Sequence, residues 1–364
     1  MTDWKDLTRR GTVTVTMVNP TDLDATMGEL EGVNLSGSSI SYGYYADTRV
    51  TGKLRVIGDG WQRGSWLRIG YRIPAWEWST ELGTFIVTND SAERQRGSWA
   101  YDLDLQSALY GLSTDLLVRP WAIARNAMAL SAMRQCVQAA GMTLVTDGAN
   151  DYRLKSAKVV ETGTSRLSAL YALTQMANDR LDVDGHGRVV VERYVAPSAK
   201  APALTIDLSD PRGVAQDGIT RTTDWLQMPD VAAVHFTYNA NGKQREINAS
   251  ATVSASSPHA HSARGYTVTD MHSLTEMSPA TAARAQQLAA QYLANDATEH
   301  VEWGLTTTFL PIKAGDVVEL VVTDGMADYQ GPRKCLVKSC EVDLGTMAMQ
   351  LTLKETASGD SEED

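Results

Sequence analysis

Hydrophobic and polar residues alternate along most of this chain with the two-residue period of strands that bury one face. The first such block spans residues 11–112, where Gly, Asp and Asn separate the segments. This pattern predicts a small antiparallel barrel or sandwich. The alternation returns after residue 203 and continues to about residue 355. Representative segments are GTVTVTMV (11–18), SWLRIGYRI (65–73), VAAVHFTYN (231–239) and GDVVELVVTD (315–324).

A helical period replaces the alternation over residues 120–141. Pro120 suits the first position of a helix, and Gly141 suits the position just past its end. Another helix is expected over about 279–297, where Ser278 is the cap and a proline follows it in the first turn. The apolar stripes of these two helices are Ile123, Ala127, Leu130, Met133 and Val137, and Ala285, Leu288, Ala289 and Tyr292.

Residues 159–195 predict a short helix that leads directly into a hairpin. The hydroxyl of Thr164 or Ser165 is placed to cap the helix, and Gly185 and Gly187 supply the positive φ of a tight turn. Four apolar residues alternate with polar ones around that turn, which predicts a half-buried strand pair. No catalytic group stands out here, so the segment indicates packing rather than chemistry. The four residues are Leu181, Val183, Val189 and Val191.

The order of these segments predicts an α+β protein that is mainly β. A strand block is followed by an α+β block and then by a second strand block with a helical insertion. Residues 196–203 have the composition of a linker, and residues 356–364 are expected to be a disordered acidic tail. Without its insertion, the second strand block has about the same length as the first, so we hypothesise that the two are related barrels.

Composition narrows the function classes. The chain has 364 residues, enough for two or three domains. Its net charge of −11 argues against general nucleic-acid binding, which needs a basic face. Nine Trp and 13 Tyr against three Phe suit half-buried strand faces and interfaces, because these rings carry a polar tip on an apolar body.

Three cysteines, Cys136, Cys335 and Cys340, are too few for a disulfide scaffold. Cys136 is expected to be buried in a helix, and the other two are expected on opposite faces of one strand, so no zinc site is predicted. The first ten residues lack the apolar core of a signal peptide, and no apolar run approaches the length of a membrane span. We therefore expect a soluble protein that folds in a cytoplasm.

Histidines offer one candidate metal site. His259 and His261 are two residues apart and His272 follows, but a solvated loop is the favoured interpretation. A calcium loop is the second candidate, since Asp182, Asp184 and Gly185 resemble the first half of such a loop. Residue 193, at its twelfth position, is arginine, which favours a plain hairpin turn.

The sequence patterns that suggest catalysis are weaker than those that suggest a metal site. Asp207, Ser209 and His235 have the residue types of a hydrolytic triad, but no Gly-x-Ser-x-Gly elbow surrounds the serine, so a turn is favoured. Asp102 and Asp104 lie on one strand face as a carboxylate pair, and are expected to face solvent or a channel. No Walker loop or dinucleotide fingerprint is present. We therefore assign no catalytic, cofactor-binding or metal-ligating residue and expect no cofactor.

Three segments together resemble the hub proteins of phage tails and related injection machines. Residues 91–117 are similar to a final barrel strand with a short helical exit. Residues 162–194 are similar to the helix and strand pair of the hubs' middle domain. Residues 301–322 are similar to the return into a second barrel, in which Pro311 and the pair Gly315-Asp316 form a turn.

This resemblance implies two antiparallel tube-like β-barrel domains, with an α+β peripheral domain inserted between and within them. It also implies a division of the chain and a channel lined by long inner strands. No separate domain is identified after the second barrel. The divisions are 1–115 (first barrel), 116–203 (peripheral domain), 204–239 plus 300–355 (second barrel), 240–299 (insertion with the helix of about 279–297, joining the peripheral domain) and 356–364 (tail).

The function that follows from the resemblance is structural. A homotrimer would adapt a sixfold tail tube to a threefold tip, and DNA would pass through its channel without specific binding. The implied partners are a tail-tube or distal tail protein, a tip or spike protein and a tape measure protein. The implied location is the virion tail tip, after synthesis in a host bacterial cytoplasm. Two alternatives remain: a tail-associated cell-wall hydrolase, and a receptor- or glycan-binding tail protein.

Overall fold

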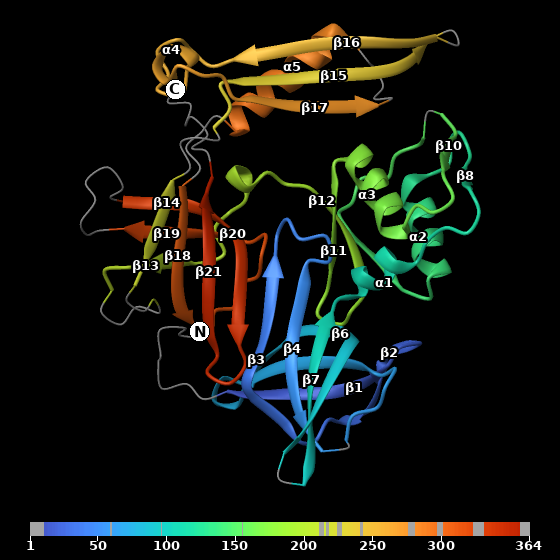
Figure 1. Cartoon of the computed structure of the whole chain (residues 1–364), viewed down its shortest axis with the longest axis vertical. Helices are drawn as coiled ribbons and strands as arrows, with labels where there is room; N and C mark the ends of the chain where they lie inside the picture. The colour runs from blue at the N-terminus through green and yellow to red at the C-terminus, as the bar shows by residue number, and fades with distance from the viewer. Residues whose placement is uncertain are drawn as a thin grey trace. The chain divides into compact units, whose positions relative to one another are not determined.

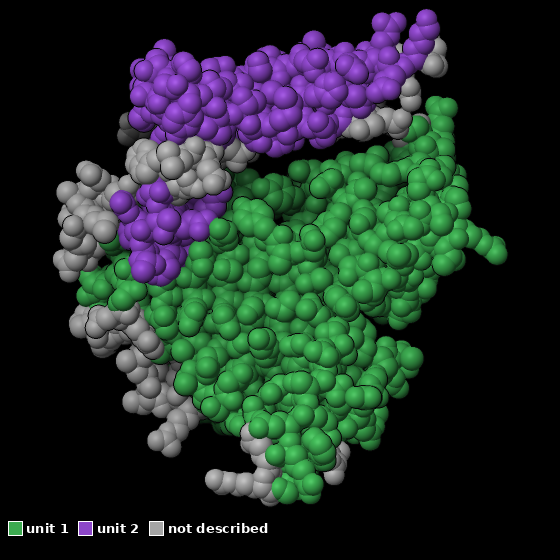
Figure 2. All heavy atoms as spheres, in the orientation of Figure 1, with its two compact units in different colours: residues 1–219, 305–352 green, residues 220–304, 353–364 purple. Residues whose placement is uncertain are grey.

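A computed structural model describes most of the chain (Figure 1). The described residues are 11–58, 60–95, 97–154, 156–210, 215, 218–223, 228–240, 243–275, 281–296, 301–322 and 331–356. The chain divides into two compact units, residues 1–219 with 305–352 and residues 220–304 with 353–364 (Figure 2). Strands outnumber helices in both units, which confirms the predicted α+β, mainly β class.

The first strand block forms an antiparallel sheet in the order β3-β4-β7-β6-β5-β1-β2. Alternate side chains of its strands are buried, as the sequence predicts: Leu67, Ile69, Phe85, Leu103 and Leu105 are at most 1% exposed. The strands are β1 (Thr12–Asn19), β2 (Asp22–Glu29), β3 (Val33–Gly43), β4 (Val50–Ile57), β5 (Trp66–Ile73), β6 (Trp78–Gln95) and β7 (Ser98–Gln106), with a 3-10 helix η1 (Pro74–Trp76) before β6.

The second strand block continues the same sheet. Strand β20 (Gly331–Asp343) pairs with β3 in antiparallel register, from Ser339 opposite Gly43 to Asp343 opposite Ser39. Beyond β20 the order is β21, β18 and β14, and β19 pairs with both β20 and β13. Among the described residues, β2 and β14 each pair with one strand of this sheet. The added strands are β13 (Thr205–Asp207), β14 (Thr220–Thr223), β18 (Val301–Thr308), β19 (Val317–Val322) and β21 (Ala348–Glu355).

Three helices gather beside short strands in the α+β segment of the first unit (Figure 1). The predicted helix over 120–141 starts too early, because Trp121–Ile123 forms β8, which pairs with β10. Asn126 then turns the chain with φ 66°, and the helix begins at Ala129. The elements are α1 (Ala108–Thr114), α2 (Ala129–Ala139), α3 (Arg166–Ala177), β9 (Leu144–Asp147), β10 (Lys158–Val160), β11 (Asp179–Val183) and β12 (Val189–Arg193).

The predicted helix and hairpin are confirmed as α3, β11 and β12. Ser165 is the cap, since its Oγ accepts the Ser168 N–H at 3.1 Å. Asn178 ends the helix in the left-handed conformation, with φ 57°. The prediction of a half-buried strand is wrong for β11, in which all five residues are buried. Its polar side chains therefore face protein rather than water.

The predicted linker is bound along the second strand block. Pro197–Ala199 forms a 3-10 helix, η2. Lys200 Nζ then donates to the carbonyl of Gly315 at 3.0 Å, and the Ala203 N–H donates to the carbonyl of Val317 at 2.7 Å. These bonds give the segment a fixed course.

The second unit contains a three-stranded sheet covered by a helix on one face. Strands β15 (Val231–Ala240), β16 (Lys243–Thr252) and β17 (Thr269–Thr275) lie in the order β16-β15-β17. Helix α5 (Ala282–Asp296) lies inside the range predicted for the third helix, whose residues 279–280 and 297 fall outside the described residues. A short helix α4 (His261–Arg264) precedes β17. The core consists of Val234, Phe236, Ala285, Leu288 and Ala289.

All three cysteines are free and buried. Cys136 lies on α2, as predicted, and both Cys335 and Cys340 lie on β20. Within the ranges given above, no helix is long and apolar enough to cross a membrane. The predicted acidic tail lies outside the described residues apart from Thr356.

Candidate functional site

Buried charged side chains of the first unit, among them Arg180 and Asp182, lie where three chain segments meet, and we call this region the junction. It joins the end of β3 and the following loop, the hairpin β11–β12, and the loop 309–316 after β18. A cavity of about 330 Å³ lies here, lined by side chains from all three segments and from β6. Tyr42, Asp182 and Phe309 are among them.

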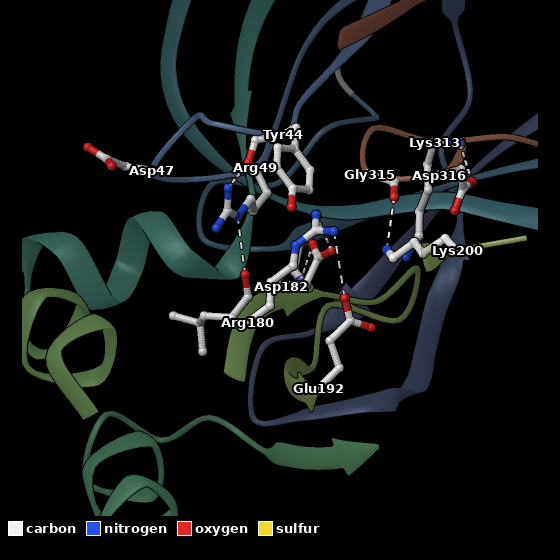
Figure 3. Close-up of polar contacts among 12 residues, drawn as sticks. Tyr44, Asp47, Arg49, Arg180, Asp182, Glu192, Lys200, Lys313, Gly315 and Asp316 are labelled. Carbon is white, nitrogen blue, oxygen red and sulfur yellow. Dashed lines mark hydrogen bonds and ion pairs between the residues drawn. The ribbon is translucent and has the colours of Figure 1, made fainter. Parts of the chain in front are cut away.

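Arg180 on β11 is the central cation of the junction (Figure 3). Its side chain is only 8% exposed, and its Nη2 lies 3.0 Å from Asp182 Oδ2. Nη1 lies 3.7 Å from Glu192 Oε1, and the guanidinium stacks over the Tyr44 ring at 4.4 Å. A buried cation needs such partners, because loss of either the charge pair or the ring contact would leave it poorly compensated.

Gly315 leaves room for that guanidinium. A Cβ at this position would lie 2.2 Å from Arg180 Nη1, and the backbone has φ +98°, which L side chains rarely adopt. The carbonyl of the same residue accepts the Lys200 Nζ bond (Figure 3). The loop before β19 is therefore held against both β11 and the linker.

Arg49 fixes the loop after β3. It adopts φ 61°, and its Nε donates to the carbonyl of Leu181 at 3.1 Å while Nη1 donates to the carbonyl of Tyr44. Its guanidinium also lies over the ring of Tyr171 on α3, 5.7 Å from the centroid. Tyr171 in turn donates its hydroxyl to the carbonyl of Asp47 at 2.7 Å. The loop is thus bonded to both β11 and α3.

The turn of the hairpin contacts β6 closely. The Thr84 hydroxyl donates to the carbonyl of Gly185 at 2.8 Å. A Cβ at Gly185 would lie 2.8 Å from both Cβ and the carbonyl oxygen of Glu81, so the close approach requires glycine here. The predicted positive φ is found at Gly187 (φ 83°), and the prediction is wrong for Gly185. The α+β segment is therefore bonded directly to the first strand block.

Burial keeps the hydroxyls and the thiol of this region neutral. Burial raises the pKa of Tyr44 to about 12, although Arg180 acts in the opposite direction. It also raises the pKa of Tyr42, whose hydroxyl donates to the carbonyl of Leu82 at 2.5 Å, and raises the pKa of Cys340 to about 12. At neutral pH these groups act as donors and packing groups, and none is poised as a base or nucleophile. The junction holds segments in place.

The candidate histidine metal site is not formed by the described residues. His259 is buried, with 5% exposure, so the solvated-loop interpretation is wrong for this residue. His261 is exposed and contacts Thr267 Oγ1 at 3.1 Å through Nδ1, and His272 pairs with Asp270 at 2.6 Å and stacks on Tyr292. In the part of the chain that the structure describes, no three His, Cys, Asp or Glu side chains are grouped as a metal site.

The favoured hairpin-turn interpretation of the calcium-like residues is confirmed. Asp184 accepts the Arg188 N–H at 2.8 Å and its Nε at 2.7 Å, which closes the turn. Asp182 pairs with Arg180 instead of joining Asp184 as a ligand. Residue Arg193 stands opposite Asp179 at the far end of the hairpin.

The three residues considered as a candidate triad have separate local partners. Ser209 donates its N–H and hydroxyl to Asp207 Oδ1, at 2.9 and 2.6 Å, so these two residues are bonded to each other. The turn predicted at Ser209-Asp210-Pro211 ends at a residue outside the described ranges. His235 belongs to the second unit, where its Nδ1 lies 2.5 Å from Asn248 Oδ1 on the neighbouring strand.

The two carboxylates on β7 also have separate partners. Asp102 pairs with Arg55 at 3.3 Å, and Asp104 accepts from Asn89 Nδ2 at 3.2 Å. Both are at least partly exposed. Each is bonded to a polar neighbour on an adjacent strand rather than to the other carboxylate.

The sequence interpretation missed Arg49 and Arg180. Charged residues in an alternating hairpin are ordinarily solvent-facing, so the pattern around β11 gave no sign that Arg180 would be buried. The one available signal was its neighbourhood: two acidic residues, Asp179 and Asp182, sit within the same five-residue strand.

We compared the chain with known proteins to find which of them share this architecture. The sequence matches no protein-family model and no curated protein. Solved structures do match: a tail protein from Neisseria meningitidis MC58 has a TM-score of 0.67 at 13% identity, covering 96% of this chain and 98% of that one. This chain has the fold of phage tail proteins. The resemblance predicted from three segments of the sequence is therefore confirmed at the level of the fold.

Other tail proteins share that fold. The 43 kDa tail protein of prophage MuSo2 from Shewanella oneidensis gives a TM-score of 0.65 at 11% identity, covering 94% of this chain and 98% of that one. The prophage tail protein gp18 from Listeria monocytogenes gives 0.57 at 10% identity, with 95% of each chain covered. A Francisella PdpA–VgrG complex gives 0.53 at 9% identity, covering 96% of this chain and 58% of that one.

Proposed function

We propose that this chain is a structural tail hub, a homotrimeric ring that joins a sixfold tail tube to a threefold tip and surrounds the DNA channel. The observation that carries the proposal is the extent of the structural likeness. It covers 96% of this chain and 98% of the Neisseria tail protein, so it includes both strand blocks and the segments between them. No catalytic role is part of the proposal.

Two strand blocks in one chain support the change of symmetry. Pairing of β20 with β3 joins the blocks into a continuous sheet. If each block completes a barrel, three chains present six barrels to a sixfold tube while the ring keeps threefold symmetry. In this proposal residues 1–115 form one barrel, and the other is formed by residues 204–239 plus 300–355 without β15 (Val231–Ala240), which pairs with β16 and β17 in the second unit. Residues 116–203 and 240–299 are peripheral.

Unpaired strand edges support ring formation. Strand β2 pairs with β1 alone among the described strands, and most of its residues are exposed, including Met27 at 49%. An exposed edge invites pairing with another chain. In a closed ring every copy would cover the edge of its neighbour, which removes that hazard.

The junction supports the same proposal from inside the chain. A ring closes only if each copy presents its two strand blocks at a constant angle. Arg180 contacts Asp182 and Tyr44 and lies against Gly315, so one side chain ties the β3 loop, the hairpin and the β19 loop together. Such buried charge networks resist small displacements, because separating the charges is costly.

The remaining parts of the proposal concern the DNA, the partner proteins and the location of the ring. A net charge of −11 suits a passage through which DNA moves without adhering, since acidic walls repel phosphates. The proposed partners are a tail-tube or distal tail protein above the ring, a tip or spike protein below it, and a tape measure protein. The proposed location is the tail tip of a virion, after synthesis in the cytoplasm of a bacterial host.

The test is the solution mass of the purified chain, measured by light scattering or native mass spectrometry and followed by negative-stain imaging. We expect three times the chain mass of 39.6 kDa, and a central hole. A monodisperse monomer would contradict a self-assembling ring. Clearing of a cell-wall suspension by the same sample would contradict a purely structural role.

A substitution at the β2 edge sharpens that test. The substitution Met27→Lys places a charge on the β2 edge and should reduce the fraction of trimer without unfolding the chain. Val118→Lys is the matched control, because Val118 is 87% exposed and lies outside every strand. Equal trimer fractions for the two variants would show that β2 is not at the subunit interface.

A further inference from the structure

Beside the junction, the first unit carries an open hollow of about 450 Å³ whose lining includes four tyrosines. Tyr44 and Tyr45 come from the loop after β3, Tyr171 from α3 and Tyr194 from the segment after β12. We call it the tyrosine hollow. Its volume falls within the range of roughly 300–1,000 Å³ that is typical of small-molecule sites.

Three of the four rings are oriented by contacts with their neighbours. Tyr44 and Tyr45 meet edge to face, with centroids 4.9 Å apart and planes at 88°. Arg180 stacks on Tyr44, while Tyr171 is held by Arg49 and by its bond to the Asp47 carbonyl. Prearranged walls lower the entropy lost when a ligand binds.

Two of the rings are open to solvent. Tyr45 is 61% exposed and Tyr194 is 38% exposed, so neither contributes much to the core. An exposed tyrosine offers an apolar face and a polar tip at small conformational cost, which suits recognition. The outer wall of the hollow is therefore aromatic and accessible.

Charge selects the class of ligand. The hollow contains two arginines and two aspartates, and the side chains of Arg49, Arg180 and Asp179 are bonded within the chain. Arg49 donates to two carbonyls and Arg180 pairs with Asp182. Asp179 accepts from the N–H and the side-chain amide of Asn150, at 3.1 and 2.9 Å. A balanced and largely compensated lining favours a neutral ligand over an ionic one.

The apolar surface of the hollow is aromatic rather than aliphatic. Leu181 is the aliphatic side chain among its lining residues, and it is 1% exposed. A protein partner that inserts a hydrophobic anchor would need a deeper apolar pocket than this. Tyrosine faces rimmed by hydroxyl, amide and carboxylate groups instead match a ligand with an apolar C–H face and a border of hydroxyls.

We propose that the tyrosine hollow is a binding site for a neutral saccharide. The sugar ring would stack on Tyr45 and Tyr194, and its hydroxyls would exchange hydrogen bonds with the polar rim, where Gln175 offers both a donor and an acceptor. This inference goes beyond the structural hub, since binding at the hollow of a single copy needs no ring. The two proposals therefore succeed or fail separately.

The experiment is ligand-observed saturation-transfer NMR on the full chain, with maltotriose and triacetylchitotriose as first probes and an array of neutral bacterial saccharides as the second. Tyr45→Ala removes one stacking face and should weaken binding at least about fivefold, the loss expected when an anchoring aromatic is truncated. Tyr45→Phe keeps the face and should retain most of the binding. Tyr266→Ala is the matched control, because Tyr266 is 40% exposed but belongs to the second unit.

Each outcome decides the inference. Transfer to the C–H protons of a sugar that is lost in Tyr45→Ala and kept in Tyr266→Ala supports it. No transfer from any neutral saccharide at millimolar concentration overturns it, as does transfer that is unaffected by Tyr45→Ala. If Tyr45→Ala instead lowers only the oligomeric state, the hollow is a contact between copies and the saccharide inference is wrong. Light scattering on the same samples detects that change.

Discussion

Replacing Gly315 by alanine tests whether the junction depends on the close approach of Arg180 to the β19 loop. The new Cβ would lie 2.2 Å from Arg180 Nη1, 2.8 Å from Nη2 and 2.9 Å from Cζ. The guanidinium would have to move, and it is 8% exposed, so it cannot move without losing contact with Asp182 and Tyr44. We expect Gly315→Ala to open the junction.

Two costs add up in this variant. A side chain in the left-handed region costs about 1–2 kcal/mol, and Gly315 has φ +98°. Separating a buried ion pair costs about 3–5 kcal/mol more. In an Arg180→Ala background only the first cost remains. The loss of stability caused by Gly315→Ala should therefore be larger in the wild-type background than in the Arg180→Ala background by about 3 kcal/mol or more. Independent sites would differ by only ~0.5 kcal/mol.

Native-state hydrogen exchange is the appropriate assay, because a chain with two units need not unfold in one step. Exchange of amides in β11 and β19 should accelerate in Gly315→Ala. The control is Gly163→Ala, since Gly163 has φ +84° and open space around the added Cβ. Equal costs for Gly315→Ala in the two backgrounds would refute the steric argument and leave only backbone strain.

Three further predictions concern other parts of the chain. Phe236→Ala should destabilise the second unit by about 3–5 kcal/mol, because Phe236 is 1% exposed in the core of that unit. Amide hydrogen exchange should accelerate in β15–β17 and not in β4–β7. Equal acceleration in both sets of strands would contradict independent unfolding of the two units. Ser165→Ala should cost about 1 kcal/mol by removing the acceptor for the Ser168 N–H; an unchanged exchange rate at the start of α3 would contradict that role. Burial raises the pKa of Cys340 from 9.0 to about 12, so its contribution to stability is complete below pH 9.0 and declines as the pH rises towards about 12. Denaturant midpoints measured across that range should fall less steeply for Cys340→Ala, and identical slopes would contradict the burial argument.

Local rules predict the elements whose signals are local. The helix and hairpin over 159–195 are correct because cap, stripe and glycine turn all lie within the segment. The start of α2 is wrong because Trp121–Ile123 finds its partner in β10, at Lys158–Val160, and strand pairing outweighs the helical period of the sequence. Tertiary contacts decide such boundaries.

The junction shows the same limit for side chains. The alternation of the sequence places Arg180 and Asp182 on the same face of β11, and the strand pairing agrees. No sequence signal near β11 predicts that this face is covered by two loops, residues 43–49 and 309–316. Each loop is more than one hundred residues away in the chain. The tyrosine hollow has the same origin, since its four tyrosines come from two distant parts of the chain, residues 44–45 and the helix–hairpin segment that contains Tyr171 and Tyr194. The composition indicated interface aromatics without placing them.

The β3–β20 pair has a consequence for biosynthesis. Gly43 and its partner Ser339 lie about 300 residues apart in the chain. At about 5–20 residues per second, β3 leaves the ribosome roughly 15–60 s before its partner exists. During that interval one edge of β3 has no strand beside it, although β4 already covers the other. Nascent chains therefore expose a strand edge long enough for chaperones to engage it, and slower translation lengthens the exposure.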